Sequence, residues 1–255
     1  MVNMRDPHVV ELRYRVQYSD GVALDTDSLP IEREFDSFRI RVTDEAATAE
    51  MKDHYATEEA AREAVEAILR PWEIFQAVHR RGISLRFAFE KAEVIDRDPP
   101  PIYLEARVEP AVQLETRILR EQRFPEPPKE FALSPAVEVM WSLYEGYLRG
   151  QDRLLPMAYT CLTRFTYSVG GDRREAANKY CISRNVLTKL ATLSTSGDEA
   201  TARKWVPGRS PQALTDQEID WAENAVRMLI LRAGQHAADP SQEWPRITMA
   251  HLPKL

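Results

Sequence analysis

Basic and polar side chains recur at short intervals between residues 173 and 189 of this 255-residue chain. Guanidinium and ammonium groups bind phosphates, and amide and hydroxyl groups read the edges of bases. The candidates are Arg173, Arg174, Lys179, Ser183, Arg184, Asn185, Thr188 and Lys189. This stretch is therefore the first candidate for a nucleic-acid-binding surface.

The charge of the chain is unevenly distributed around a net value of -6. Residues 1–125 carry 18 basic and 25 acidic side chains, a net of -7, whereas residues 164–209 carry 9 basic and 4 acidic ones, a net of +5. A phosphate group responds first to the local field. The net negative charge argues against binding of nucleic acid by the whole protein surface, but it is compatible with one localised binding site.

The segment Asp172–Leu193 predicts two short helices joined by a tight turn. A helix-turn-helix needs a small contact residue and buried apolar residues at fixed spacing, and Ser183 can cap the second helix. Residues with that spacing are Ala177, Ile182, Leu187 and Leu190. The segment resembles the helix-turn-helix of phage repressors, which implies a recognition helix in the major groove of duplex DNA and a protein that binds as a homodimer.

Cys181 departs from this pattern, because glycine usually stands at the turn position, where φ is positive. A non-glycine residue in that conformation costs on the order of 1 kcal/mol. The alternative is an ordinary helical hairpin inside a bundle, with solvated charges, in a non-catalytic interaction or assembly protein. Solvent exposure of residues 183–189 distinguishes the two hypotheses, because DNA binding requires these side chains to be uncovered.

Arg246 and His251, with four residues between them, resemble the active motif of HEPN-type ribonucleases. In that family the pair lies on one helix of a dimeric α-bundle and attacks RNA; a histidine moves protons near neutral pH and an arginine holds a phosphate. Ile247 stands where the motif usually carries a polar residue, and Pro245 and Pro253 leave little room for a helix. The ribonuclease is a second alternative.

Other chemistry has little support in the sequence. There is no glycine-rich phosphate loop, and the histidines lack metal-ligand spacing, so no cofactor and no metal are expected. His54 with Glu50 and Asp53 comes nearest to a metal cluster, but a solvated strand end explains it better. Cys161 and Cys181 are expected to be buried structural thiols.

Apolar residues alternate with polar ones in the N-terminal half, which predicts strands separated by one long helix. Thr57 should cap that helix, Pro71 should kink or restart it, and Gly82 should end it. The fold class expected is α+β, with a mainly antiparallel sheet packed on the helix. The expected strands cover residues 10–18, 38–42, 48–55, 83–95, 102–108 and 112–119.

The spacing of apolar residues changes after a proline-rich segment, which predicts a domain boundary there. The expected parts are an α+β domain at 1–125, a linker at 126–134 and an all-helical domain at 135–255. A capping box at Thr215 and Glu218 begins the last long helix, and the tail after it should pack on the bundle. The other expected helices cover residues 135–148, 152–168 and 198–205, besides the hairpin.

No apolar run approaches the roughly 20 residues that span a bilayer, and the N-terminus does not resemble a signal peptide. A cytoplasmic protein without a membrane partner is expected. Segments 95–101, 157–163 and 214–218 resemble a group of bacterial proteins of unknown function over most of the chain. That resemblance implies no activity and assigns no catalytic residue.

Overall fold

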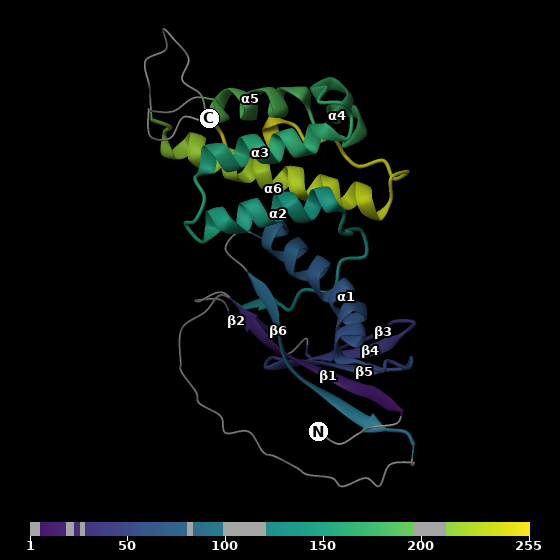
Figure 1. Cartoon of the computed structure of the whole chain (residues 1–255). Helices are drawn as coiled ribbons and strands as arrows, with labels where there is room; N and C mark the ends of the chain where they lie inside the picture. Colours follow the sequence, from purple (N-terminus) through teal and green to yellow (C-terminus); the bar gives the residue numbers. More distant parts are fainter. Residues whose placement is uncertain (1–5, 19–22, 26–28, 81–83, 99–120, 196–212) are drawn as a thin grey trace. The chain divides into compact units, whose positions relative to one another are not determined.

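The computed structural model describes residues 6–18, 23–25, 29–80, 84–98, 121–195 and 213–255. The chain forms two compact units, Met1–Pro127 and Pro128–Leu255, which divide within the proline-rich segment. The fold is α+β, with an antiparallel sheet and one long helix in the first unit and a helical bundle in the second (Figure 1). Among the described residues, no helix is long and apolar enough to cross a membrane.

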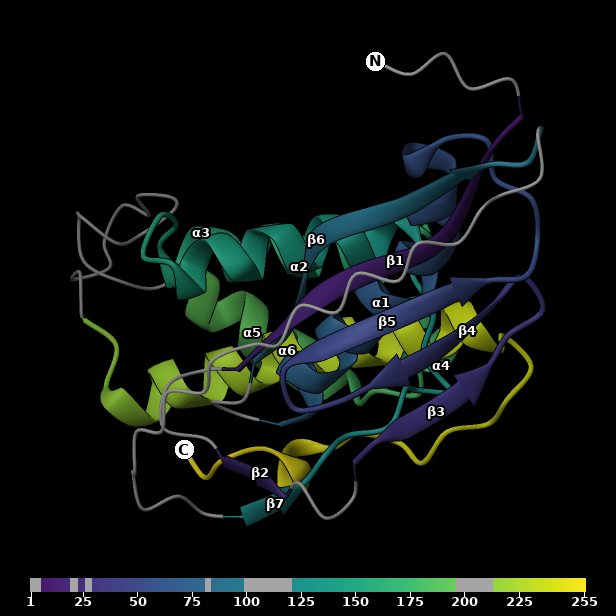
Figure 2. The same cartoon turned by 90° about the horizontal axis from the view of Figure 1, so that it is seen from below.

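The sheet has five strands in the order β3-β4-β5-β1-β6, and every neighbouring pair is antiparallel (Figure 2). The strands are β1 (Pro7–Tyr18), β3 (Ile31–Glu34), β4 (Phe38–Val42), β5 (Ala46–Met51) and β6 (Leu85–Asp96). Two short strands, β2 (Ala23–Asp25) and β7 (Glu121–Arg123), form a separate parallel pair.

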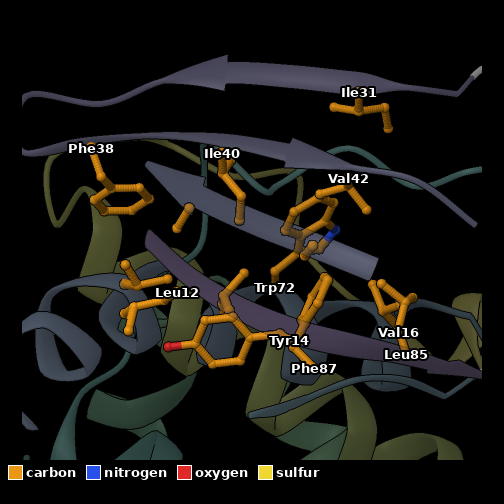
Figure 3. Packing of buried hydrophobic residues seen from close by; sticks show 14 of the residues in the cluster. Leu12, Tyr14, Val16, Ile31, Phe38, Ile40, Val42, Trp72, Leu85 and Phe87 are labelled. Atoms are coloured by element: carbon orange, nitrogen blue, oxygen red, sulfur yellow. The ribbon is translucent and has the colours of Figure 1, made fainter. Parts of the chain in front are cut away.

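The core of the first unit lies between one face of the sheet and α1 (Glu58–His79). Alternate residues of β1 point inward, so Leu12, Tyr14 and Val16 are buried, and Trp72 of α1 meets them across the core (Figure 3). The ring centroid of Trp72 lies 5.1 Å from that of Phe87. Each large apolar side chain buried here contributes about 1.5–3 kcal/mol.

Local capping signals predicted the start of α1 correctly. The Thr57 hydroxyl accepts a hydrogen bond from the Ala60 N–H at 3.3 Å. The helix continues through Pro71 as one element rather than restarting there, and it ends at His79. The sequence did not predict β3, because Ile31 is its only apolar residue. The strands expected at 102–108 and 112–119 and the helix expected at 198–205 lie outside the described residues.

In the bundle, α3 packs against four other helices and occupies the centre, as its apolar surface predicted. The hairpin helices α4 and α5 lie on one side of the bundle, and α2 lies on the other (Figure 1). The elements are α2 (Pro135–Leu148), α3 (Leu154–Tyr167), α4 (Arg173–Lys179), α5 (Arg184–Ser194), α6 (Asp216–Ala238) and the 3-10 turn η2 (Met249–His251).

The segment before α2 is held on α6 by a close approach at Gly234. Phe131 is buried, and the N–H of Ala132 donates to the Gly234 carbonyl at 3.0 Å. A Cβ atom at residue 234 would overlap the Phe131 ring. Glycine is required here by space, although it lies inside a helix.

We predict that Gly234→Ala lowers the free energy of unfolding by about 1–3 kcal/mol, because the Phe131 ring must move in a packed interior. Alanine's helix propensity, better by about 1 kcal/mol, offsets only part of this loss. Urea denaturation of the full chain measures it.

Gly146→Ala in α2 is the matched control. A Cβ atom there meets the carboxylate end of Asp152, a flexible side chain that can move away. This variant should be neutral or slightly stabilising. Equal stabilisation by both substitutions would contradict the packing argument.

Candidate nucleic-acid interface

The segment predicted as a helical hairpin forms one, with a capping side chain at the start of each helix. The Asp172 carboxylate accepts from the N–H groups of Arg174 at 2.6 Å and Glu175 at 3.2 Å. The Ser183 hydroxyl accepts from the Asn185 N–H at 3.3 Å, as the sequence predicted. The second helix therefore begins at Arg184.

The turn between the helices contains one residue in the left-handed backbone conformation. Cys181, at the position where glycine was expected, has φ 48° and is the only non-glycine residue with positive φ in the described part of the chain. The Ile182 N–H donates to the Ala177 carbonyl at 3.1 Å, which closes the turn. The cysteine thus adopts the conformation that usually selects glycine.

The inner face of the hairpin is apolar and packs against the rest of the bundle. Helix α5 contacts α3 and α6, and α4 contacts α3. The four residues that the motif requires to be small or apolar are all buried: Ala177, Ile182, Leu187 and Leu190. Packing therefore fixes which side of α5 faces outward.

The outward side carries the predicted polar residues. Arg184, Asn185 and Thr188 are exposed on α5, and Arg173 and Arg174 are exposed on α4. Thr192, one turn beyond Thr188, is exposed as well, and sequence analysis did not single it out. No other described helix covers these side chains.

Three arginines lie on this face, Arg173, Arg174 and Arg184. None of them forms an ion pair with a residue that the structure describes. Arginines on the sheet differ, because Arg13 and Arg15 both pair with Glu90. Other paired arginines of the first unit include Arg33, Arg39, Arg41 and Arg62. The hairpin thus keeps guanidinium groups available for a partner.

The other predicted site residues are partly engaged within the bundle. The Lys179 ammonium donates to the Ser168 hydroxyl at 3.2 Å and lies 5.2 Å from the Tyr180 ring centroid. Lys189 lies 3.8 Å from Glu218, and its side chain is 34% exposed. Ser183 is half-buried and serves as the cap. Lys189 is therefore a weaker candidate than Arg184.

Asp172, beside the arginines, is held ionised. Hydrogen bonds from the backbone N–H groups of Glu175 and Arg174 lower its pKa, and the charges of Arg184 and Arg174 add to this effect. Its negative charge is directed at the start of α4, where it caps the helix.

The chain matches no protein-family model, no curated protein and no solved structure. The resemblance to a helix-turn-helix therefore depends on the hairpin's own residues and geometry.

Arg246 and His251, the weaker catalytic candidates, do not share a helix. Arg246 lies in the extended tail after α6, and His251 ends the turn η2. The Nδ1 atom of His251 accepts from the Thr248 N–H at 3.0 Å and lies 2.9 Å from the Thr248 hydroxyl. The ribonuclease motif implies a common helix, which this arrangement lacks.

His54 belongs to a cluster that the sequence did not indicate. Its Nδ1 lies 3.2 Å from Nδ1 of His8 and 3.2 Å from Nη1 of Arg97, and its Nε2 lies 3.5 Å from Asp6. Since arginine only donates, Nδ1 of His54 accepts and offers no free lone pair to a cation. Among the described residues, no group of three or more His, Cys, Asp or Glu could hold a metal ion.

We predict that Cys181→Val lowers the free energy of unfolding by about 1–2 kcal/mol, because a β-branched residue is strained at positive φ. Cys181→Gly, which relieves that strain, should be tolerated and is the paired control. Thermal unfolding of both variants measures the difference, and equal stability would exclude a strained turn at this position.

The two thiols should differ in reactivity. Burial raises the pKa of Cys161 to about 12, whereas Cys181 is only half-buried, unlike the buried thiol that the sequence predicted. One thiol per chain should react with iodoacetamide at pH 8 in the native protein, and two after unfolding, because the thiolate is the nucleophile. Mass spectrometry identifies the modified residue; rapid modification of native Cys161 would contradict its burial.

Proposed function

We propose that this protein binds duplex DNA through the outward face of α5 and the first turn of α4. The observation that carries the proposal is the group of exposed arginines without ion-pair partners, Arg173, Arg174 and Arg184, in a chain whose net charge is -6. A local positive surface of this kind binds phosphate even when the whole protein is acidic.

The dimensions of α5 suit the major groove. Its 11 residues give a length of roughly 16 Å, and the groove is about 12 Å wide. Arg184 and Thr188 lie one turn apart on α5, Asn185 lies three residues before Thr188, and all three side chains are exposed. Arginine pairs with guanine, asparagine pairs with adenine, and threonine contacts the thymine methyl group.

A single short helix buries too little surface for specific affinity, so we propose that the protein binds as a homodimer in the cytoplasm. Each copy would engage one half-site, and the half-sites would lie one helical turn of DNA apart or a multiple of it.

The second candidate function is a non-catalytic assembly protein. Its support is two exposed apolar side chains of the bundle, Leu148 at the end of α2, which is 57% exposed, and Tyr167 at the end of α3, which is 76% exposed. This candidate requires self-association or a protein partner, and it leaves Arg184 without a role.

We predict that the double substitution Arg184→Ala and Lys189→Ala weakens binding to a labelled generic duplex at low salt by tenfold or more. The reason is that a direct contact of an arginine with DNA contributes about 1–3 kcal/mol. Most of the loss should come from Arg184, since Lys189 already pairs with Glu218. Fluorescence anisotropy measures both single variants and the pair.

Arg149→Ala is the matched control, because Arg149 lies just after α2 and pairs with Glu145 at 2.9 Å. Its affinity for DNA should equal that of the wild type. The absence of any binding by the wild type at low salt would overturn the proposal, and a concentration-dependent increase in mass without DNA binding would favour the assembly protein.

A further inference from the structure

The tail after α6 is joined to the hairpin turn by backbone pairing. Ile247 forms a parallel bridge with Ile182, in which its N–H donates to the Cys181 carbonyl at 2.9 Å and its carbonyl accepts from the Ser183 N–H at 2.7 Å. The Ile247 side chain is buried. The tail therefore lies beside the residue that caps α5.

A buried arginine of α6 also contacts the tail. Arg232 of α6 donates to the Pro245 carbonyl, and its guanidinium carbon lies 5.7 Å from the Trp244 ring centroid. Burial lowers the pKa of Arg232, and hydrogen bonds from its two terminal nitrogens to Gln235 and Pro245 replace part of the lost hydration, while its Nε atom has no hydrogen-bond partner among the described residues. Residues 244–247 are thus fixed from two sides, by α6 and by the hairpin turn.

This docking determines where Arg246 lies. In a parallel bridge that pairs Ile247 with Ile182, the residue before Ile247 lies alongside Cys181. Neighbouring residues of an extended segment point to opposite sides, and Arg246 is exposed while Ile247 is buried. Arg246 forms no ion pair with any residue in the described part of the chain. It adds one more available guanidinium beside the start of α5.

We infer that the tail is a second element of the DNA-binding surface, in which Arg246 contacts a backbone phosphate of the duplex that α5 engages. This inference rests on the proposed function. Arg246 is carried by the tail and flanks α5, so it reaches the backbone beside the groove rather than the base edges within it. Arginine binds phosphate through two parallel hydrogen bonds, which suits a positioning contact without sequence preference.

The test measures the affinity of the full chain for a fluorescein-labelled generic duplex over a series of salt concentrations. Arg246→Ala should weaken binding roughly threefold to tenfold and reduce the slope of log affinity against log salt by about 1. Arg246→Lys should retain most of the affinity, because lysine also binds phosphate. Arg149→Ala should match the wild type in both affinity and slope.

Ile247→Ser tests whether docking places Arg246. It removes the buried anchor, so it should weaken binding as much as Arg246→Ala, and the two substitutions together should be no worse than Ile247→Ser alone. Additive losses would overturn the role of docking.

The outcomes separate the inference from the proposed function. If Arg184→Ala weakens binding while Arg246→Ala leaves affinity and salt slope unchanged, the tail is not part of the surface and the inference is overturned alone. If the wild type does not bind, or Arg184→Ala has no effect, the proposed function fails and the inference fails with it.

Discussion

The reversal of the chain at Cys181–Ser183 is the constraint on which the candidate surface depends. It places Ala177 of α4 and Leu187 of α5 on the same buried side and directs Arg184 outward. The left-handed conformation of Cys181 costs about 1–2 kcal/mol. Burial of Ile182 contributes about 1.5–3 kcal/mol and offsets that cost. The turn also exposes the backbone groups of residues 181 and 183 to which the tail is bonded.

Arginines of the sheet and arginines of the hairpin differ in whether they form ion pairs. On the sheet they lie opposite glutamates, as Arg39 does with Glu34, and such exposed pairs contribute little to stability. Because an exposed ion pair contributes so little, the absence of an ion pair at Arg184 costs the folded protein little stability. Its guanidinium donors are therefore available to a partner without the loss of an existing ion pair.

Local signals in the sequence predicted most helix starts and the buried side of the hairpin. Thr57, Ser134 and Thr215 each cap the helix expected of them, because capping depends on residues within one turn. The partners of Lys189 and His54 could not be predicted, since Glu218 and Arg97 are distant in the chain and only the fold brings them near. The sequence predicted that the tail packs on the bundle, but for the same reason it did not predict the bridge between Ile247 and Ile182.

Photo-crosslinking tests most directly whether the outward face of α5 contacts DNA. A photoreactive amino acid at Thr188, on that face, should crosslink to a duplex at low salt. The same group at Val139, exposed on α2 on the other side of the bundle, should not. Equal crosslinking from both positions, or crosslinking from Val139 alone, would contradict the account.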